Sequence, residues 1–246
     1  MPIIYLSPST QDWNMYVTGS GSEEYNMNLL ADALVPYLRA NAIQYRRNTP
    51  DMTAASSIRE ANRGYYDLYL ALHSNAAPEG RYGEERGIVA FYYPGSVQGQ
   101  RAAELLADSL REIYPLPDRV TTRATTSLGE VRQSRAPAVL LEIGYHDNPA
   151  DARWVENNMD AIARQIAMGL TEFFGVPFIW PIEPMDGEVD VEYGTLNLRS
   201  TPSPTGTVIA NMPDDAKVRI YGEWQGWSVV HYRNYVGYAA AAYIDT

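Results

Sequence analysis

The stretch Leu68-Tyr-Leu-Ala-Leu-His73-Ser-Asn75 is an apolar strand that ends on a histidine. A second apolar stretch, Ala138-Val-Leu-Leu-Glu142, ends on a carboxylate in the same way. In open α/β sheets, functional sites form outside the carboxyl ends of the strands. A histidine and a glutamate at two such ends indicate one metal-assisted hydrolytic centre. The alternative is that each is a polar residue where a buried strand reaches the surface.

The sequence around these strands alternates between strand and helix patterns over residues 1–178. This alternation predicts an α/β fold with a mostly parallel sheet flanked by helices. Apolar periodicity and capping residues place the elements. We expect strands at 3–6, 44–47, 68–75, 87–93 and 138–142, and helices at 23–40, 53–63, 97–114 and 149–174.

The composition changes after residue 178. Residues 179–187 are rich in proline and lack periodicity, which predicts a linker. Residues 188–246 contain short alternating strands separated by turns, which predicts a small all-β barrel. The expected domains are therefore 1–178 and 188–246.

Charge and composition exclude several classes of function. The chain has a formal net charge of -11, which argues against a nucleic-acid partner. It contains no cysteine, so disulfides and thiolate metal sites are excluded, and only three histidines. No apolar run approaches the ~20 residues of a membrane span. The N-terminus enters a strand without a basic region, so we expect no signal peptide.

Three stretches in the first 174 residues carry a family resemblance. They are Glu24-Tyr-Asn-Met-Asn28-Leu, the run from Arg59 to Asn75, and Ser134-Arg-Ala-Pro137 continuing through Glu142 to Asn148-Pro. In this order and spacing they resemble the zinc-dependent N-acetylmuramoyl-L-alanine amidases of the amidase 3 type. The resemblance covers roughly residues 3 to 174.

The resemblance implies roles for particular residues. Glu24 and His73 would bind Zn²⁺, which lowers the pKa of a bound water from ~15.7 toward ~7. Glu142 would be the catalytic base, and its place at the end of an apolar strand should raise its pKa. Glu23 competes with Glu24, but the spacing to Asn28 favours Glu24. Asn75 and Arg132 are further expected to bind substrate. The alternative for Arg132 is that it is an exposed arginine with no specific role.

One loop departs from the family pattern. The family places its first zinc histidine in an Asp-Pro-Gly-His-Gly loop after the first strand, whereas this chain reads Ser7-Pro-Ser-Thr10-Gln11. A glutamine oxygen can bind a metal but is a poorer zinc donor than imidazole. Three outcomes remain open. Gln11 completes the site, Thr10 or a water does so, or the site binds metal weakly or not at all; we favour Gln11.

The C-terminal segment resembles bacterial SH3-like domains over about residues 189–243. The stretches that carry this resemblance include Leu196-Asn-Leu-Arg199 and Gly226-Trp227-Ser-Val-Val. Trp224 and Tyr238 are candidates for stacking on sugar or peptide ligands. The alternative for Tyr238 is that it fills the core of the barrel.

Together these features predict a peptidoglycan hydrolase that cuts the amide between N-acetylmuramic acid and L-alanine with a zinc-activated water. It would act on the bacterial cell wall and stay cytoplasmic until released, as a phage lysin or by lysis of a mother cell. Two alternatives are open. One is a weakly active or inactive wall-binding protein on an amidase scaffold, and the other is a zinc peptidase of the stem peptide.

Overall fold

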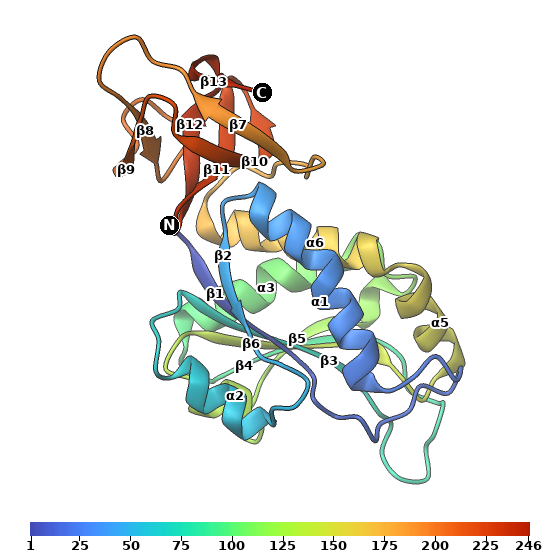
Figure 1. Ribbon diagram of the computed structural model, residues 1–246. Coiled ribbons are helices and arrows are strands. Elements are labelled where there is room, and N and C mark those ends of the chain that lie inside the picture. The colour runs from blue at the N-terminus through green and yellow to red at the C-terminus, as the bar shows by residue number, and fades with distance from the viewer. The chain divides into compact units, whose positions relative to one another are not determined.

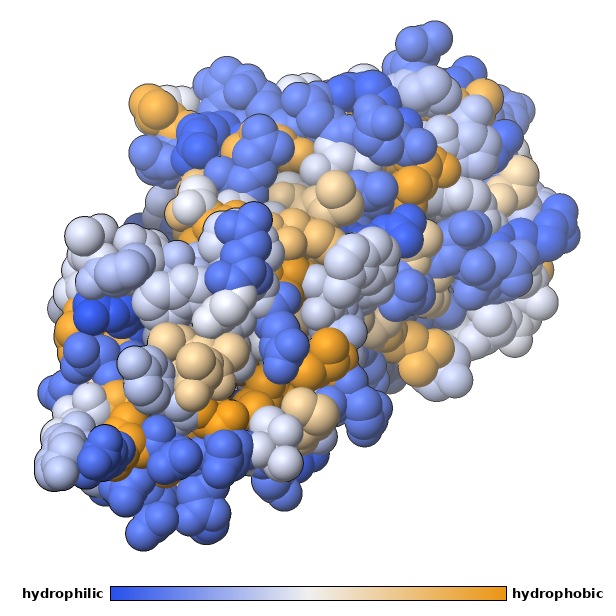
Figure 2. Space-filling view, turned by 90° about the horizontal axis from the view of Figure 1, so that it is seen from above, coloured by the Kyte–Doolittle hydropathy of each residue, from blue (hydrophilic) through white to orange (hydrophobic).

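The computed structural model describes residues 1–246, and its contacts divide them into two compact units. The first, here called the α/β unit, contains Ile3–Leu34 and Tyr45–Phe174. The second, the C-terminal unit, contains Met1–Pro2, Val35–Gln44 and Gly175–Thr246. No helix is both long enough and apolar enough to cross a membrane. On the face drawn in Figure 2, hydrophobic residues surface as patches between hydrophilic side chains.

A six-stranded sheet in the order β2-β1-β3-β6-β4-β5 organises the α/β unit (Figure 1). Neighbouring strands β1 and β3, β3 and β6, and β4 and β5 are parallel, whereas β4 runs antiparallel to β6. A mixed α/β sheet with flanking helices confirms the expected fold class. The strands are β1 Ile3–Pro8, β2 Gln44–Arg47, β3 Leu68–Asn75, β4 Ile88–Tyr92, β5 Val120–Ala124 and β6 Ala138–Tyr145. The helices are α1 Glu23–Ala40, α2 Ala54–Ala61, α3 Val97–Arg111, the short η1 Pro117–Arg119, α4 Gly129–Gln133, α5 Pro149–Asn157 and α6 Met159–Phe174.

Both faces of this sheet are buried, which explains the unbroken apolar runs of its central strands. Tyr5, Tyr69 and Leu140 pack on one face against Ile58 of α2 and Val131 of α4. In Figure 1, α2 lies on the opposite side of the sheet from α3 and α6. Successive side chains alternate between the faces, so His73 and Glu142 continue the rows that face α2 and α4.

The helix that the sequence predicts over 149–174 is two helices in the structure. Asn148 caps the first, because its side chain accepts hydrogen bonds from two backbone amides of the first turn. Asn158 lies between the two helices with φ -128° and ψ 21°, outside the α-helical region. Its side chain donates to the Trp154 carbonyl, while its own carbonyl accepts from the Ile162 amide. Asparagine thus ends one helix and starts the next.

A seven-stranded antiparallel sheet forms most of the C-terminal unit, in the order β13-β7-β10-β11-β12-β8-β9. The all-β character that the sequence predicts for this region is confirmed. Buried side chains such as Leu198, Met212 and Val230 form its core. The strands are β7 Met185–Val189, β8 Thr195–Arg199, β9 Val208–Pro213, β10 Lys217–Trp224, β11 Trp227–Tyr232, β12 Tyr235–Ala240 and β13 Ile244–Asp245, with the short helix η2 at Ala241–Tyr243.

The segment predicted as a linker is more ordered than its proline content indicates. Ile179 is 2% exposed, and its backbone amide and carbonyl both bond to the side chain of Asn41, at 2.6 and 3.0 Å. The last residues of the predicted linker belong to strand β7. Prolines restrict the chain here, but a buried side chain and paired backbone groups fix it within the C-terminal unit.

Candidate functional site

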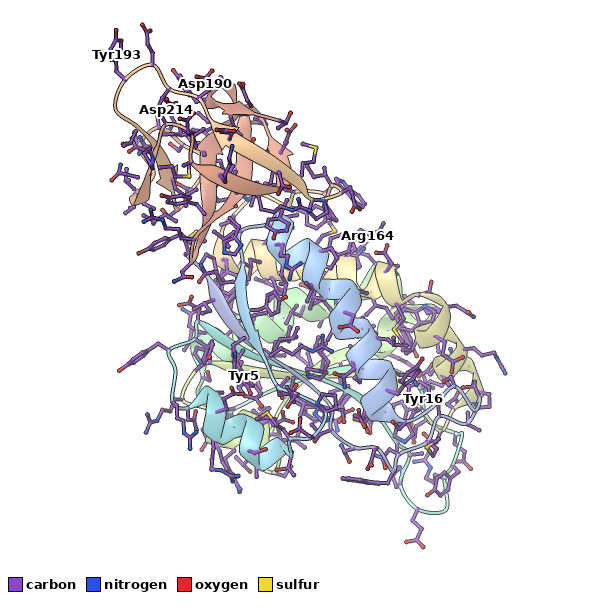
Figure 3. All side chains as sticks on the ribbon, in the orientation of Figure 1. Tyr5, Tyr16, Arg164, Asp190, Tyr193 and Asp214 are labelled. Carbon is purple, nitrogen blue, oxygen red and sulfur yellow. The ribbon has the colours of Figure 1, made fainter.

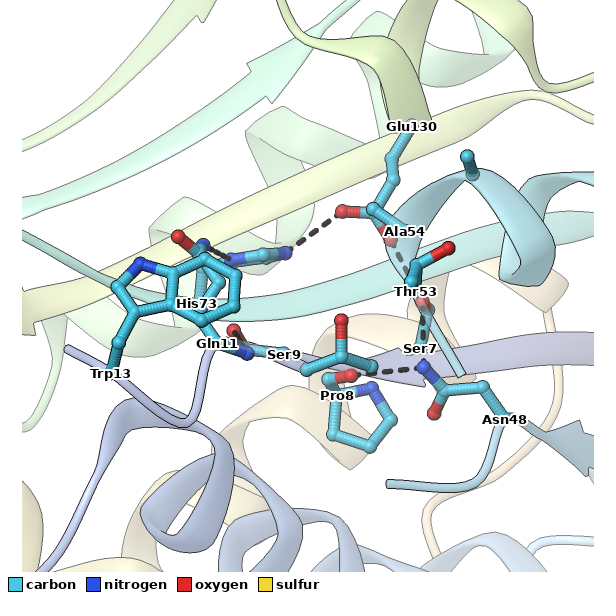
Figure 4. A pocket seen from close by; sticks show the side chains of 12 residues that line it. Ser7, Pro8, Ser9, Gln11, Trp13, Asn48, Thr53, Ala54, His73 and Glu130 are labelled. Carbon is cyan, nitrogen blue, oxygen red and sulfur yellow. Dashed lines mark hydrogen bonds and ion pairs between the residues drawn. The ribbon is translucent and has the colours of Figure 1, made fainter. Parts of the chain in front are cut away.

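The site lies where β1, β3 and β6 end. His73 and Glu142 are paired neighbours on adjacent parallel strands. The loop after β1 begins with a backbone hydrogen bond of 2.9 Å from Ser9 to the Leu72 carbonyl, which holds the loop beside His73. A cleft of about 370 Å³ opens there, with the indole of Trp13 at its edge (Figure 4). Its lining residues are Ser7, Pro8, Ser9, Thr10, Gln11, Trp13, Asn48, Thr53, Ala54, Ala55, His73 and Glu130.

A buried carboxylate contacts each ring nitrogen of His73. Nδ1 lies 2.8 Å from Glu23 Oε1, at the start of α1. Nε2 lies 2.8 Å from Glu130 Oε2, on the short helix α4. All three side chains are buried, with 8, 1 and 5% of the residue exposed for His73, Glu23 and Glu130. We call these three residues the Glu-His-Glu cluster.

Neighbouring polar groups complete the hydrogen bonds of both carboxylates. Glu130 Oε1 accepts from Ser7 Oγ and from the Tyr69 hydroxyl, each at 2.8 Å. Glu23 Oε2 accepts from Asn14 Nδ2 at 2.8 Å. Each carboxylate is therefore held by the fold independently of His73.

The opposite charges within the cluster stabilise the ionised forms of all three side chains, although burial disfavours them. Burial disfavours a charged imidazole, but Glu130 and then Glu23 outweigh it and raise the pKa of His73 well above its usual value. Burial also opposes ionisation of the two carboxyls, yet His73 lowers the pKa of both Glu23 and Glu130. The cluster is thus stable as two carboxylates around an imidazolium.

Glu142 stands beside this cluster without a partner of its own. Its Oε2 is buried and has no hydrogen bond, while the residue as a whole is partly exposed. Burial, together with the charges of Glu23 and Glu130, raises the pKa of Glu142 to about 7, although His73 acts in the opposite direction. A carboxyl with such a pKa exchanges protons near neutral pH, which suits a general base that later acts as an acid.

The residues that the sequence selects as metal ligands are not all in the cluster. His73 is central to it. Glu24 is only half-buried, and Glu23 makes the contact with His73 in its place. Gln11 is close, with Nε2 3.5 Å from His73 Nδ1, but its Oε1 already accepts from Asn14 at 3.0 Å. Thr10 lines the cleft beside Gln11.

The zinc ion implied by the family resemblance does not fit this set of donors. Catalytic zinc sites use three protein ligands such as His₃, His₂Glu or Cys₂His, with neutral imidazoles. Here His73 supplies the single imidazole, and the side chain beside it from the loop after β1 is the amide of Gln11 instead of a second histidine. No group of three or more His, Cys, Asp or Glu residues is arranged to hold a metal ion.

The residues predicted to bind substrate in the α/β unit lie outside the cleft lining. Asn75 is half-buried, and its Oδ1 accepts from the next backbone amide, at Ala76. Arg132 is exposed on α4, two residues after Glu130. Their roles in substrate binding stay predictions.

In the C-terminal unit, the two aromatic residues predicted to stack on ligands differ from each other. Tyr238 is fully buried, and its hydroxyl donates to the Asn41 carbonyl at 3.4 Å, so it fills a core and cannot stack on a ligand. Trp224 is partly buried and packs against the same cluster of Ala42, Ile179 and Val229. A groove of about 530 Å³ opens elsewhere on this unit. Tyr193, one of the residues that line it, lies on the loop before β8 (Figure 3). The lining comprises Val191, Glu192, Tyr193, Thr195, Leu196, Asn197, Arg199, Pro204, Trp227, Ala240 and Tyr243.

Sequence reasoning considered Glu23 but preferred Glu24, and it missed Glu130 altogether. Glu23 shares a helix face with Met27, Leu30 and Leu34, at spacings of 4, 7 and 11, so helical periodicity alone would have placed it inward. Glu130 lies in a stretch of only five helical residues, without a side-chain cap, where no periodic pattern can form. Its burial depends on the sheet beneath it.

Comparisons with known proteins agree with this fold. A family model described as N-acetylmuramoyl-L-alanine amidase matches residues 14–172, more than half of the chain, and a bacterial SH3 domain model matches residues 194–245. The amidase match begins after the loop that lacks the first histidine.

Among curated proteins, the chain is 24% identical over 182 residues to the N-acetylmuramoyl-L-alanine amidase CwlM of Bacillus licheniformis. This alignment covers 70% of this chain and 69% of CwlM. It is 29% identical over 112 residues to the probable cell wall amidase LytH of Staphylococcus aureus, covering 44% of this chain and 35% of LytH.

Two solved structures share the fold of the α/β unit. The amidase AmiC2 of Nostoc punctiforme superposes with a TM-score of 0.62 at 15% identity, covering 71% of this chain and 97% of that one. An amidase of Clostridium difficile 630 gives 0.62 at 18% identity, with the same coverage of both chains. By the extent of its family match, this chain belongs to the N-acetylmuramoyl-L-alanine amidase family and carries a bacterial SH3 domain after the amidase domain.

Proposed function

We propose that this protein hydrolyses the amide between the lactyl group of N-acetylmuramic acid and L-alanine in peptidoglycan, with Glu142 as its general base and acid. The observation that carries this proposal is the unpartnered Glu142 oxygen at the end of β6, in a fold of the amidase family. Release of new N-terminal alanine from purified cell wall tests it.

The reaction requires one proton to move twice. Glu142 takes a proton from water as the water oxygen bonds to the carbonyl carbon. It then gives that proton to the alanine nitrogen as the carbon–nitrogen bond breaks, leaving a lactyl carboxylate and a free alanine amine. The 370 Å³ cleft would hold the substrate, with Trp13, 69% exposed, offering an aromatic face to a sugar ring.

The rate of hydrolysis should depend on pH as Glu142 ionises. Because the base must be deprotonated and the pKa of Glu142 is about 7, the rate rises as the pH increases through 7 and levels off above it. At pH 5 about one hundredth of Glu142 is ionised, so the rate should be about one hundredth of the plateau. Initial rates of alanine release from pH 5 to 9, with wall binding measured at each pH, check this. A rate that does not change between pH 5 and 8 would contradict the role of Glu142.

We further propose that the groove of the C-terminal unit holds the enzyme on peptidoglycan. Tyr193 and Tyr243 line this groove and are 86% and 51% exposed, so their rings are free to pack on sugar or peptide groups. Attachment through a second domain raises the local substrate concentration without a new catalytic contact.

Replacing both tyrosines by alanine should weaken binding to purified cell wall about tenfold, a loss of ~1.4 kcal/mol. The melting temperature should not change, because both side chains are exposed. Tyr235→Ala is the matched control, since Tyr235 is 46% exposed and lies outside the groove. Pelleting assays with whole sacculi give the affinities. Equal binding by the double variant and wild type would place the wall contact elsewhere.

A second function, wall binding without turnover, is favoured by one observation: the site lacks a third metal ligand. It predicts that native protein and Glu142→Gln bind cell wall equally and that neither releases alanine. The same assay of alanine release therefore separates the two functions.

A further inference from the structure

The loop between β1 and α1 turns its apolar side chains outward. Trp13, Met15 and Val17 are 69, 58 and 53% exposed, and the residues between them are half-buried or buried. This alternation is that of an extended segment, in which successive side chains point to opposite faces. We call these three residues the apolar row. Exposed apolar side chains that gather on one face indicate an interaction site.

The inward side chains of the loop fix it to the rest of the α/β unit. The ring of Tyr16 is buried and stacks on His146, with the ring centroids 5.9 Å apart. The backbone amide of Val17 donates to the His146 carbonyl at 2.9 Å, and the Thr18 hydroxyl donates to Glu156 of α5. The apolar row is therefore held in place before a ligand arrives, which reduces the entropy lost on binding.

One end of the apolar row belongs to the cleft. Trp13 lines the cleft, with its indole at the edge (Figure 4), whereas Met15 and Val17 lie outside the lining. The row thus begins at the cleft and leads away from it. A substrate that fills the cleft and extends beyond it past Trp13 would lie on Met15 and Val17.

The charges around the apolar row favour an uncharged partner. Residues 1–38 contain no lysine or arginine, whereas Asp12 is exposed directly beside Trp13. Anionic lipid surfaces attract basic segments, so this loop is unsuited to them. The sugar rings of a glycan chain are uncharged, and their CH groups pack on aromatic and aliphatic side chains. The surface therefore fits a glycan better than a membrane.

We infer that the apolar row is a binding subsite for the glycan chain, in contact with sugars beyond the muramic acid whose amide is cut. The inference deepens the proposed function and rests on it for the place of that muramic acid in the cleft. It gives the enzyme a preference for long glycan chains, because only a long chain reaches Met15 and Val17.

Two soluble substrates with the same scissile amide test this inference. One is a glycan chain of several disaccharides that carry stem peptides, and the other is a single muramic acid with its stem peptide. Met15→Ser combined with Val17→Thr makes the row polar and leaves Trp13 in place. The ratio of kcat/KM for the long substrate to kcat/KM for the short one should fall about tenfold, mainly through the KM of the long substrate.

Met168→Ser combined with Val97→Thr is the matched control. These two residues are 40% and 75% exposed, and they lie on α6 and α3, outside the cleft lining. This control should keep the wild-type ratio. Both double variants should keep the wild-type melting temperature, because every substituted side chain is exposed.

Three results would overturn the inference. The first is a substrate ratio that changes less than about twofold in the row variant. The second is an equal fall on both substrates, which would limit the loop to shaping the cleft. The third is binding to anionic phospholipid vesicles, or self-association in ultracentrifugation, that the row variant loses, since the row would then serve a membrane or a second copy.

Binding of a soluble chain of N-acetylglucosamine units separates the inference from the proposed function. This chain has no stem peptide to be cut, and the groove of the C-terminal unit is the same in wild type and row variant. A difference in their dissociation constants therefore reports the row. Tighter binding by wild type supports the inference even if no alanine is released and the proposed function fails. Alanine release with equal dissociation constants and an unchanged substrate ratio supports the proposed function and overturns the inference.

Discussion

Replacing Glu142 by glutamine is expected to lower alanine release from peptidoglycan by about 10²- to 10⁴-fold, the usual contribution of a general base. Glutamine keeps the size of the side chain but cannot take a proton from water. Binding to purified cell wall should not change. The substitution removes only one of several side chains at the end of β6 and β3, and it leaves the groove of the C-terminal unit intact. Initial rates on purified sacculi give the comparison.

Stability distinguishes a catalytic loss from a folding loss in this variant. Burial of the ionised Glu142 is unfavourable, as its raised pKa shows, so a neutral glutamine should leave the melting temperature equal or higher. Glu104→Gln on α3, an exposed position, is the matched control and should keep full activity. Retention of more than a tenth of the wild-type rate by Glu142→Gln would remove Glu142 from the mechanism.

Replacing His73 by phenylalanine is expected to destabilise the α/β unit by about 3–5 kcal/mol, the cost of breaking a buried ion pair from one side. Glu23 and Glu130 would remain buried and charged, with Glu142 close by. Adding Glu23→Gln and Glu130→Gln to this variant removes those charges and should recover part of the loss. Urea unfolding at pH 7 measures each difference.

The pH dependence of this loss has a defined sign. The lowered pKa of Glu23 and Glu130 stabilises the fold above their unfolded value of 4.5, and this stabilisation is lost as the pH falls through their folded pKa. The raised pKa of His73 stabilises the fold below 6.5 and is lost as the pH rises through its folded value. The loss of stability caused by His73→Phe should therefore be largest between pH 4.5 and pH 6.5, the two unfolded pKa values. His231→Phe, in the C-terminal unit, is the control, and a His73→Phe penalty below about 1 kcal/mol would contradict a charged cluster.

The strands that carry the site could be predicted from the sequence because both faces of the sheet are buried. The resulting apolar runs end at His73 and Glu142, and the two residues are neighbours in the structure. The helix over Glu23–Ala40 was predicted at its observed bounds, because its apolar face recurs at helical spacing. Patterns of this kind report burial directly, so they locate the elements that build the core.

The residues that surround His73 depend on contacts that no local pattern contains. The choice of Glu24 rested on its spacing to Asn28, but Asn28 accepts from Arg47 at 2.7 Å and contributes nothing to the cluster. Glu130 meets His73 from 57 residues away in the chain. The sequence around Tyr238 does not show whether its ring is exposed or buried, and only the structure places it in a core with its hydroxyl bonded to Asn41.

The most direct test of the proposed chemistry is mass spectrometry of purified peptidoglycan digested by the full chain. We predict two matching sets of products: glycan fragments that carry a free lactyl carboxylate on N-acetylmuramic acid, and stem peptides that begin with a free L-alanine amine. Both sets should be absent from the Glu142→Gln digest. Intact stems on every muramic acid, or new amino termini only within the stem peptide, would contradict the assignment of this site to amide hydrolysis at L-alanine.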